Sequence, residues 1–405
     1  MKSHHGFFAL LLVVCILSGL SSPASALKVD STEIWTSQPI GVASTDSETP
    51  LQIDSTGKAH VAFIGWPPGY ASSQPAGLNY AVLQNGEWVY ETIEIGGEIG
   101  PSFDMALDKG GYPYIVYSIR TNEGQVDVRC ASKSSGNLLP WNTVAYNVGK
   151  ADHINVRMDY LGNPAVSFLD QTGTVKIYKY SSLKGWGLPK NFSGPQISPS
   201  LGIDSSDILS LAYLEADRDL IYAIEGSPWT IDPVEAAGKV PGNSVVLAFD
   251  KSYIPHIAYE GAPSGGSGFT LHLASKHDGT WTDDEIDPVS RIEGGIALVL
   301  DEQDRAHLTY KDVTQNSLWY AAEIGTGEWD ISKVGSFAAG GHAASLALDL
   351  QQKPHIFTWD RSQVDSTQTV NYLSLATRTP TPTPTPTSIS PPSSSPQIFL
   401  PLVLH

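Results

Sequence analysis

The sequence predicts an all-β fold, a seven-bladed β-propeller of four-stranded antiparallel blades, on three observations. An apolar strand ending in aspartate recurs every 45 to 54 residues, which is the length of a propeller blade. A tryptophan follows near the end of six repeats, but Trp35 precedes every such aspartate and the last repeat has no tryptophan at its own end. We therefore expect the N-terminal strand to complete the last blade and close the ring. The aspartates are Asp54, Asp108, Asp159, Asp204, Asp250, Asp301 and Asp349.

Each aspartate is expected to begin a tight turn between the first and second strands of a blade. An aspartate side chain accepts a hydrogen bond from the backbone two residues on, and glycine suits a positive φ. The fourth residue of the turn is Gly57, Gly111, Gly162, Asp207, Tyr253, Asp304 or Gln352.

The second strand of each repeat carries two regularly placed residues. Six residues after the aspartate stand His60, Tyr114, Ala165, Ser210, His256, His307 and His355. Nine residues after it stand Phe63, Tyr117, Phe168, Tyr213, Tyr259 and Tyr310, whereas the seventh repeat has Thr358 between Phe357 and Trp359. Since these residues occur once per blade, we expect the aromatics to form the core between blades.

The third and fourth strands complete the repeat. The third carries Tyr80, Cys130, Tyr178, Tyr222, Leu273, Tyr320 and Tyr372 at corresponding places. After a short polar turn, the fourth is expected to open with Trp88, Trp141, Trp186, Trp229, Trp281 and Trp329. The propeller should span residues 27–376 as one domain, because a blade cannot bury its faces alone.

The two ends of the chain are predicted to lie outside the propeller. Residues 1–26 have the charge, apolar run and small-residue cleavage site of a secretory signal, so the mature chain should begin near Leu27. Cys130 is then the sole cysteine, and no intramolecular disulfide is expected. Residues 377–396 form a Thr/Pro/Ser-rich linker, expected to be extended. Residues 397–405 form a short hydrophobic tail, either an envelope-attachment signal without the sortase pattern or an inert end.

The charge of the chain disfavours some partners. Its net charge is -18, and such a surface repels phosphate backbones and anionic headgroups. We therefore expect no nucleic-acid partner, and no other apolar run is long enough to span a bilayer. No glycine-rich phosphate loop, nucleophile elbow or paired Cys-x-x-Cys occurs, and we expect no cofactor or metal.

The polar turn before the fourth-strand tryptophan carries a family resemblance. The segment from Ser275 to Trp281 resembles a worn Asp-box hairpin of sialidase-like, BNR-repeat propellers, one residue out of register. The segment from Asp250 to Tyr259 resembles repeats of secreted bacterial propellers. The resemblance implies the fold. A sialidase would also need an Arg-Ile-Pro segment, which is absent, so no catalytic residues are carried over.

The repeated histidines His60, His256, His307 and His355 are interpreted as structural. Residues at equivalent positions of the repeat lie in different blades, too far apart to bind one metal ion. Each histidine also follows a hairpin turn, where a hydrogen bond from its side chain could tie neighbouring blades.

The candidate site lies where propeller loops vary, on the face formed by the loops from strand two to three and from strand four to the next blade. We call this the loop face. Arginines there could bind a carboxylate in bidentate fashion, or instead pair with surface acids. The candidate residues are Arg120, Arg218, Arg291, Arg361, His153, His342, Asp170, Asp312 and Asp360. The acids Asp283, Asp284, Glu285 and Asp287 are assigned to protecting an outer strand edge.

These features indicate an exported, envelope-associated binding or scaffold module, with glycans or surface polymers as the ligand class. The alternative is a hydrolase or lyase with a single site on the loop face near the central channel, formed by the arginines with the candidate acids or histidines. An enzyme requires a carboxylate or histidine in the same pocket as an arginine. Oligomeric state is left open.

Overall fold

The computed structural model describes residues 33–377, except 71–73, 97, 135–136, 193–196, 239, 241, 265–267, 337–343 and 362–367. The predicted signal, the tail, His342 and the linker beyond Thr377 lie outside the described residues. Thr377 itself ends the last strand rather than beginning a linker.

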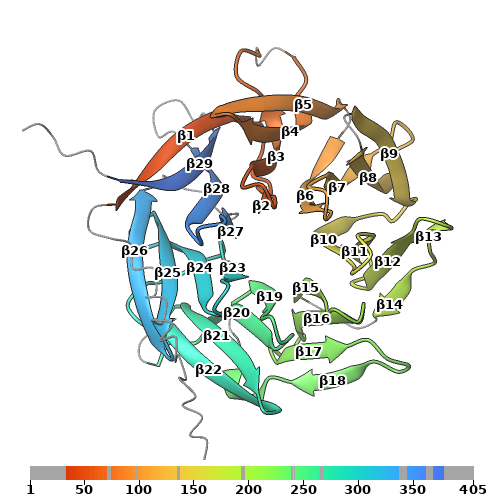
Figure 1. Cartoon of the computed structure of the whole chain (residues 1–405). Coiled ribbons are helices and arrows are strands. Elements are labelled where there is room, and N and C mark those ends of the chain that lie inside the picture. Colours follow the sequence, from red (N-terminus) through yellow and green to blue (C-terminus); the bar gives the residue numbers. More distant parts are fainter. Residues whose placement is uncertain are drawn as a thin grey trace, which may run out of the picture.

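The strands form antiparallel groups arranged in a ring (Figure 1). In chain order, the first groups are β2 (Leu51–Ile53), β3 (Ala59–Trp66), β4 (Gly77–Gln84) and β5 (Glu87–Ile95), then β6 (Glu98–Leu107), β7 (Pro113–Arg120), β8 (Val126–Ser134) and β9 (Asn137–Ala145). Next come β10 (Ala151–Met158), β11 (Pro164–Asp170), β12 (Val175–Ser181), β13 (Gly185–Trp186) and β14 (Lys190–Phe192), then β15 (Ile197–Ile203), β16 (Leu209–Leu214), β17 (Leu220–Ile224) and β18 (Thr230–Pro233).

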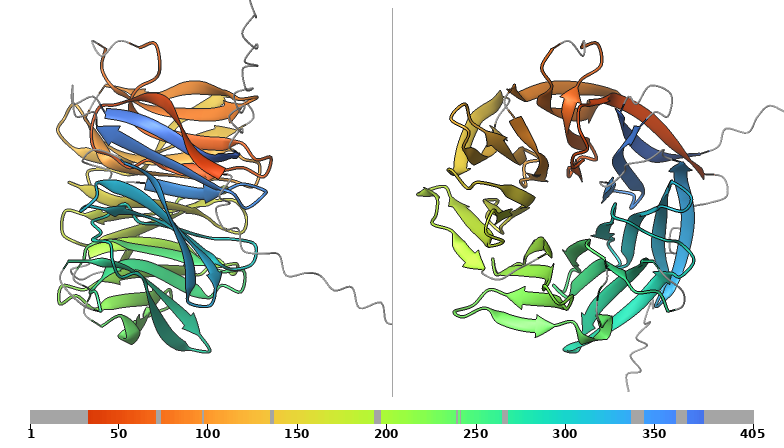
Figure 2. Two further views of the ribbon diagram at one scale, coloured as in Figure 1. Left: turned by 90° about the vertical axis from the view of Figure 1, so that its left-hand side faces the viewer. Right: turned by 180° about the vertical axis from the view of Figure 1, so that it is seen from behind.

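The remaining groups follow the short 3-10 helix η1 (Glu235–Ala237). They are β19 (Val245–Phe249), β20 (Pro255–Gly261), β21 (Thr270–His277) and β22 (Thr280–Asp287), then β23 (Ala297–Leu300), β24 (Ala306–Asp312), β25 (Ser317–Gly325) and β26 (Glu328–Ser336). The last group joins β27 (Ala344–Leu348), β28 (Pro354–Arg361) and β29 (Gln368–Thr377) to β1 (Glu33–Ala43) from the other end of the chain. Figure 2 shows the ring from the side and from behind.

The two ends of the described chain meet in the pairing of β1 with β29. The strands run antiparallel, with Trp35 opposite Leu375 and Gln38 opposite Tyr372, and they lie side by side in Figure 1. At its far end β1 also pairs with β3, through Val42 and Ala43. The predicted pairing of the Trp35 segment along the Tyr372 segment is confirmed.

The core lies between neighbouring blades. The second-strand aromatics are buried there, from Phe63 to Tyr310, and Thr358 takes the same place between buried Phe357 and Trp359. At three of the interfaces, the fourth-strand tryptophan of one blade packs edge-on against a third-strand tyrosine of the blade before it, whereas Trp186 packs on Tyr180 of its own blade and Trp229 on Phe192. Ring centroids are 5.1 Å apart for Trp88 and Tyr372, 5.7 Å for Trp281 and Tyr222, and 5.6 Å for Trp35 and Tyr320. Trp35 thus takes the position of the fourth-strand tryptophan in the last blade. The repeated aromatics are core residues.

The aspartate turns form as predicted. Oδ1 of Asp54 accepts hydrogen bonds from the backbone N–H of Thr56 at 2.8 Å and of Lys58 at 2.9 Å. The same pair of bonds recurs at Asp204, Asp250, Asp301 and Asp349. Each turn is therefore specified by its own first residue.

The repeated histidines are structural, but they bond within a blade rather than between blades. Nδ1 of His60 lies 2.6 Å from the Tyr80 hydroxyl, and Nε2 lies 3.3 Å from Oδ2 of Asp54. His307 and His355 repeat this arrangement with Tyr320 and Tyr372. The reason is geometric, because the turn, the second strand and the third strand of one blade are the elements that converge there. His60, His307 and His355 thereby tie their own turns to their own third strands, whereas Nδ1 of His256 lies 2.8 Å from the Ser275 hydroxyl and its Nε2 is 3.9 Å from Asp250.

Two further expectations about outer strands need correction. Trp141 lies in the middle of β9 rather than at its start, and the outer strand after Trp186 is split into β13 and β14. The acids of β22 do not simply protect an edge, because Tyr259 donates to Asp283 at 2.5 Å and Tyr310 of the next blade donates to Asp287 at 2.6 Å. Those carboxylates accept bonds from core tyrosines.

Ring closure through Trp35 generates a stability prediction. Trp35→Ala should lower the free energy of unfolding by about 2–4 kcal/mol, since it removes a large partly buried side chain from the last interface. Ile34→Ala, which changes the alternate side of the same strand, should have a much smaller effect. Thermal and denaturant unfolding measure both. Equal stability of the two variants would contradict the role assigned to Trp35.

The histidines generate a pH prediction. Burial lowers the pKa of His60, His256 and His355 in the folded state. In the unfolded chain the histidine pKa is near 6.5, so on acidification the unfolded state takes up protons at a higher pH than the folded state does. The free energy of unfolding therefore decreases as pH falls below about 6.5. Melting temperatures measured from pH 8 to pH 4.5 should therefore fall on acidification. The fall should be shallower in His60→Gln and His355→Gln, and parallel profiles in parent and variants would refute the assignment.

Candidate functional site

The innermost strands line a channel along the axis of the ring. Alternate residues of a strand face the same side, and those two and four positions before the turn aspartates line the channel cavities. The cavity at the loop face has a volume of about 690 Å³. The cavity at the opposite face, which carries the aspartate turns and is called the turn face, has about 490 Å³.

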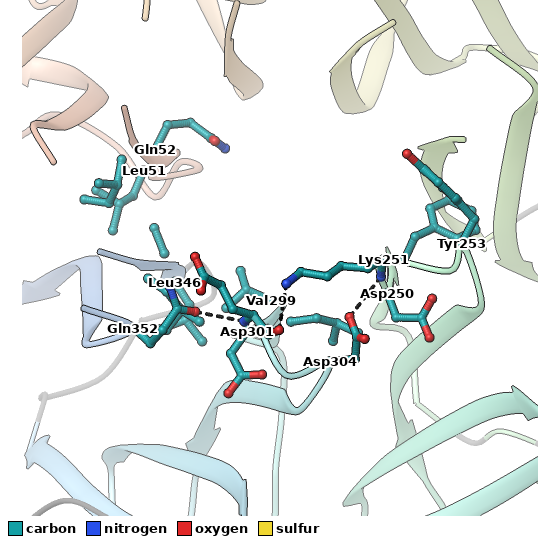
Figure 3. Close-up of a pocket in the computed structure, with 16 residues that line it drawn as sticks. Leu51, Gln52, Asp250, Lys251, Tyr253, Val299, Asp301, Asp304, Leu346 and Gln352 are labelled. Atoms are coloured by element: carbon teal, nitrogen blue, oxygen red, sulfur yellow. Dashed lines mark hydrogen bonds between the residues drawn. The ribbon is translucent and has the colours of Figure 1, made fainter. Parts of the chain in front are cut away.

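The polar groups at the turn face are engaged in holding the blades together (Figure 3). The backbone N–H of Lys251 donates to Oδ1 of Asp304 in the next blade at 2.9 Å, and its Nζ donates to the Glu302 carbonyl at 2.7 Å. One blade further, the Glu302 N–H donates to Oε1 of Gln352 at 3.0 Å. Asp304 and Gln352 have φ of 60° and 63°, a region that favours glycine. Glycine is replaced at these two turn positions because each side chain accepts a hydrogen bond from the neighbouring blade, which glycine could not do.

The loop-face cavity holds charged residues outside the predicted set. Nη1 of Arg157 on β10 lies 2.9 Å from Oδ2 of Asp104 on β6, which also accepts the Val156 N–H at 2.9 Å. Glu48, just before β2, lines the same cavity. Glu48 is exposed to solvent in the channel, but the mass of protein around it and the neighbouring Asp104 carboxylate both disfavour its charged form and raise its pKa to about 7. A carboxyl group able to exchange a proton near neutral pH therefore shares a cavity with an arginine.

Irregular inner strands shape the rim of this cavity. Pairing shifts register in β10 and β15 around His153 and Ser198, which have positive φ of 49° each. The displaced backbone is held by bonds between blades: the Ile154 N–H donates to the Ser102 hydroxyl at 2.9 Å, and the Asn155 amide donates to the Pro199 carbonyl at 3.2 Å. The rim is thus held in place before any ligand arrives.

The four predicted arginines lie apart from the channel cavities, each with its own partner. Arg120 pairs with Glu98 at 2.6 Å, and Arg361 pairs with Asp46 at 2.9 Å. Arg218 donates to the Gly242 carbonyl at 2.9 Å and to Oδ1 of Asn243 at 2.7 Å, and Asn243 lines the loop-face cavity. Arg291 donates to the Ser290 carbonyl at 3.2 Å.

The predicted acids and histidines are also scattered. Asp170 and Asp312 end their strands and accept backbone bonds from Thr172 and Thr314, each at 2.8 Å, so they shape turns. Asp360 lies near the end of β28. Among the described members of the predicted set, His153 is the one that lines the loop-face cavity.

Comparison of the repeats distinguishes Arg157 and Asp104 from the residues at equivalent positions. Two positions before the turn aspartate, the repeats have Gln52, Ala106, Arg157, Gly202, Ala248, Val299 and Ala347. Arg157 is the charged member of an otherwise uncharged series, and four positions before the aspartate Asp104 stands out in the same way. Within the described ranges, no group of three or more His, Cys, Asp or Glu is arranged to hold a metal.

Comparison with known proteins supports the fold. A polysaccharide lyase described as PL25 ulvan lyase superposes with a TM-score of 0.54 at 11% identity, over 82% of this chain and 93% of that one. The polysaccharide lyase Uly1 gives 0.51 at 10% identity, over 83% and 91%. The GH93 α-L-arabinofuranosidase of Fusarium graminearum gives 0.49 at 12% identity, over 84% and 97%. No family model and no curated protein matches the sequence.

At these identities the likeness concerns the fold alone. The chain is an all-β protein of antiparallel, mostly four-stranded sheets whose structural neighbours have the propeller fold, so the sialidase-like resemblance holds at the level of the fold. In the part of the chain that the structure describes, no helix has the length and apolarity of a membrane span.

Proposed function

We propose that this chain is an exported, envelope-associated seven-bladed β-propeller that binds glycans or surface polymers at the loop-face mouth of its channel. In this proposal, residues 1–26 are a signal, residues 27–376 the propeller, 377–396 a linker and 397–405 an attachment tail. Seven turn aspartates, and the completion of the last group by β1, support the blade count.

The observation that carries the binding role is the loop-face cavity of about 690 Å³. Its volume suits a small ligand or one part of a polymer. Its lining combines Arg157, Asp104 and Glu48 with Asn155, Asn243 and Ser345, a set of donors and acceptors suited to hydroxyl groups. The two lyases described above have TM-scores above 0.5, and a structure of the ulvan lyase is bound to a GlcA–Rha3S saccharide, which favours glycans as the ligand class.

The binding proposal is tested with Arg157. Screening the protein on an array of neutral, uronic-acid and sialic-acid glycans should identify a ligand. Arg157→Gln should then weaken its affinity by about tenfold, as expected when one charged hydrogen-bond donor is lost. Arg305→Gln removes an arginine–aspartate pair at the turn face and is the matched control.

Arg120→Ala and Arg361→Ala examine the loop-face arginines in the same assay. Weaker binding of acidic glycans supports their contribution, and unchanged binding in both variants discards an arginine site there. If Arg157→Gln and Arg305→Gln bind the ligand equally well, the channel mouth is not the binding site.

A second candidate function, a glycan-acting hydrolase or lyase, is favoured by Glu48. The pKa of this carboxyl is raised to about 7, and it shares its cavity with Arg157. A general acid must be protonated to act, so activity should fall as pH rises above about 7. Glu48→Gln should abolish cleavage of a bound glycan, followed as reducing ends or as absorbance of an unsaturated product, while binding persists. Undiminished cleavage by Glu48→Gln would remove this candidate.

A further inference from the structure

A second cavity lies beside the loop that joins β3 to β4, away from the channel. Its volume is about 310 Å³, and its lining includes Trp66, Pro67, Tyr70, Pro75 and Ile95. Trp66 is not one of the repeated tryptophans of the outer strands. Apart from the Tyr70 phenol, no ionisable side chain of a described residue lines this cavity, although the protein as a whole is strongly charged. We call it the Trp66 cleft.

The floor of the Trp66 cleft is held rigidly. The Asn79 side-chain amide, which is buried, donates to the Gly65 carbonyl at 3.0 Å and to the Gly77 carbonyl at 2.9 Å. It thereby clamps the two ends of the loop together. The Asn79 oxygen accepts the Thr92 hydroxyl at 2.9 Å. Because these groups are already paired, the cleft is formed in advance of any ligand.

The walls of the cleft are apolar and open to water. Tyr70 is 58% exposed and Ile95 is 67% exposed. The Trp66 indole donates its N–H to the Gln74 carbonyl at 2.8 Å, which fixes the ring against the loop. An exposed aromatic and aliphatic surface held in a fixed shape is typical of a binding site.

We propose that the Trp66 cleft is a stacking subsite for an uncharged sugar ring of the glycan, and this inference rests on the proposed glycan-binding function. A charged ring would lose water there without gaining an ionic partner. A peptide backbone would find few partners, since the Trp66 indole N–H, the Asn79 amide and the Thr92 hydroxyl are already bonded. A pyranose ring instead places its C–H face against Trp66 and Tyr70 and keeps its hydroxyls in water.

The test measures binding of neutral pyranose oligosaccharides, gluco-, galacto- and manno-configured, by titration calorimetry. Trp66→Ala and Tyr70→Ala should each weaken binding of the preferred oligosaccharide by about tenfold, and Trp66→Phe should retain most of it. Tyr160→Ala is the control, because Tyr160 is 64% exposed and lies in a turn at the turn face. Tyr70 lies outside the core clusters, so Tyr70→Ala should fold normally. This variant therefore tests the cleft even if Trp66→Ala is unstable.

The outcomes separate this inference from the function on which it rests. If Arg157→Gln weakens glycan binding but the Trp66 and Tyr70 variants do not, the cleft is overturned and the channel mouth stands. If the Trp66 and Tyr70 variants alone weaken it, the cleft stands and the channel mouth fails. Absence of any glycan binding overturns both, and saturable binding of a proline-rich peptide or a fatty acid that Tyr70→Ala abolishes overturns the sugar assignment.

Discussion

The pairing of β1 with β29 is the constraint on which the rest of the molecule depends. A propeller blade is stable only when both of its faces are covered, so a ring with one incomplete blade exposes two interfaces at once. Here the strand that completes the last blade comes from the opposite end of the chain, and its Trp35 packs on Tyr320 of the preceding blade. The channel, its two mouths and the loop face keep their shape because this closure holds the blades together.

Most side chains that suggest chemistry are used to build the scaffold. The Asp–His–Tyr sets contain the residue types of a proton relay, yet each set lies within a separate blade and links a turn to a third strand. The acids of β22 accept bonds from core tyrosines. These side chains recur from blade to blade, and a residue that is required in every blade has a role in folding. Candidates for function are the residues that break the repeat: Arg157, Asp104, Glu48 and Trp66.

The sequence was sufficient for the repeated parts of the fold because local rules decide them. A turn aspartate bonds to its own backbone, and a once-per-blade aromatic has a single buried place. The candidate site was harder to predict. The variable loops predict exposed arginines such as Arg120 and Arg361, but the position of a loop does not determine whether a guanidinium pairs with Glu98 or Asp46. Within a single repeat nothing marks Arg157 or Asp104 as special, and their charge stands out only when the same position is compared across all repeats.

By itself the sequence determined the repeat, its turns, its core aromatics and the out-of-place strand around Trp35, since each depends on spacing along the chain. The tertiary structure decided which charged groups meet. Glu48, Asp104 and Arg157 belong to three different repeats and come together because the ring directs their strands towards one axis. At the Trp66 cleft, Gly65 and Gly77 lie opposite each other in the β3–β4 ladder, and Asn79 donates to both of their carbonyls. Distances across a closed ring depend on all blades at once, and no local pattern encodes them.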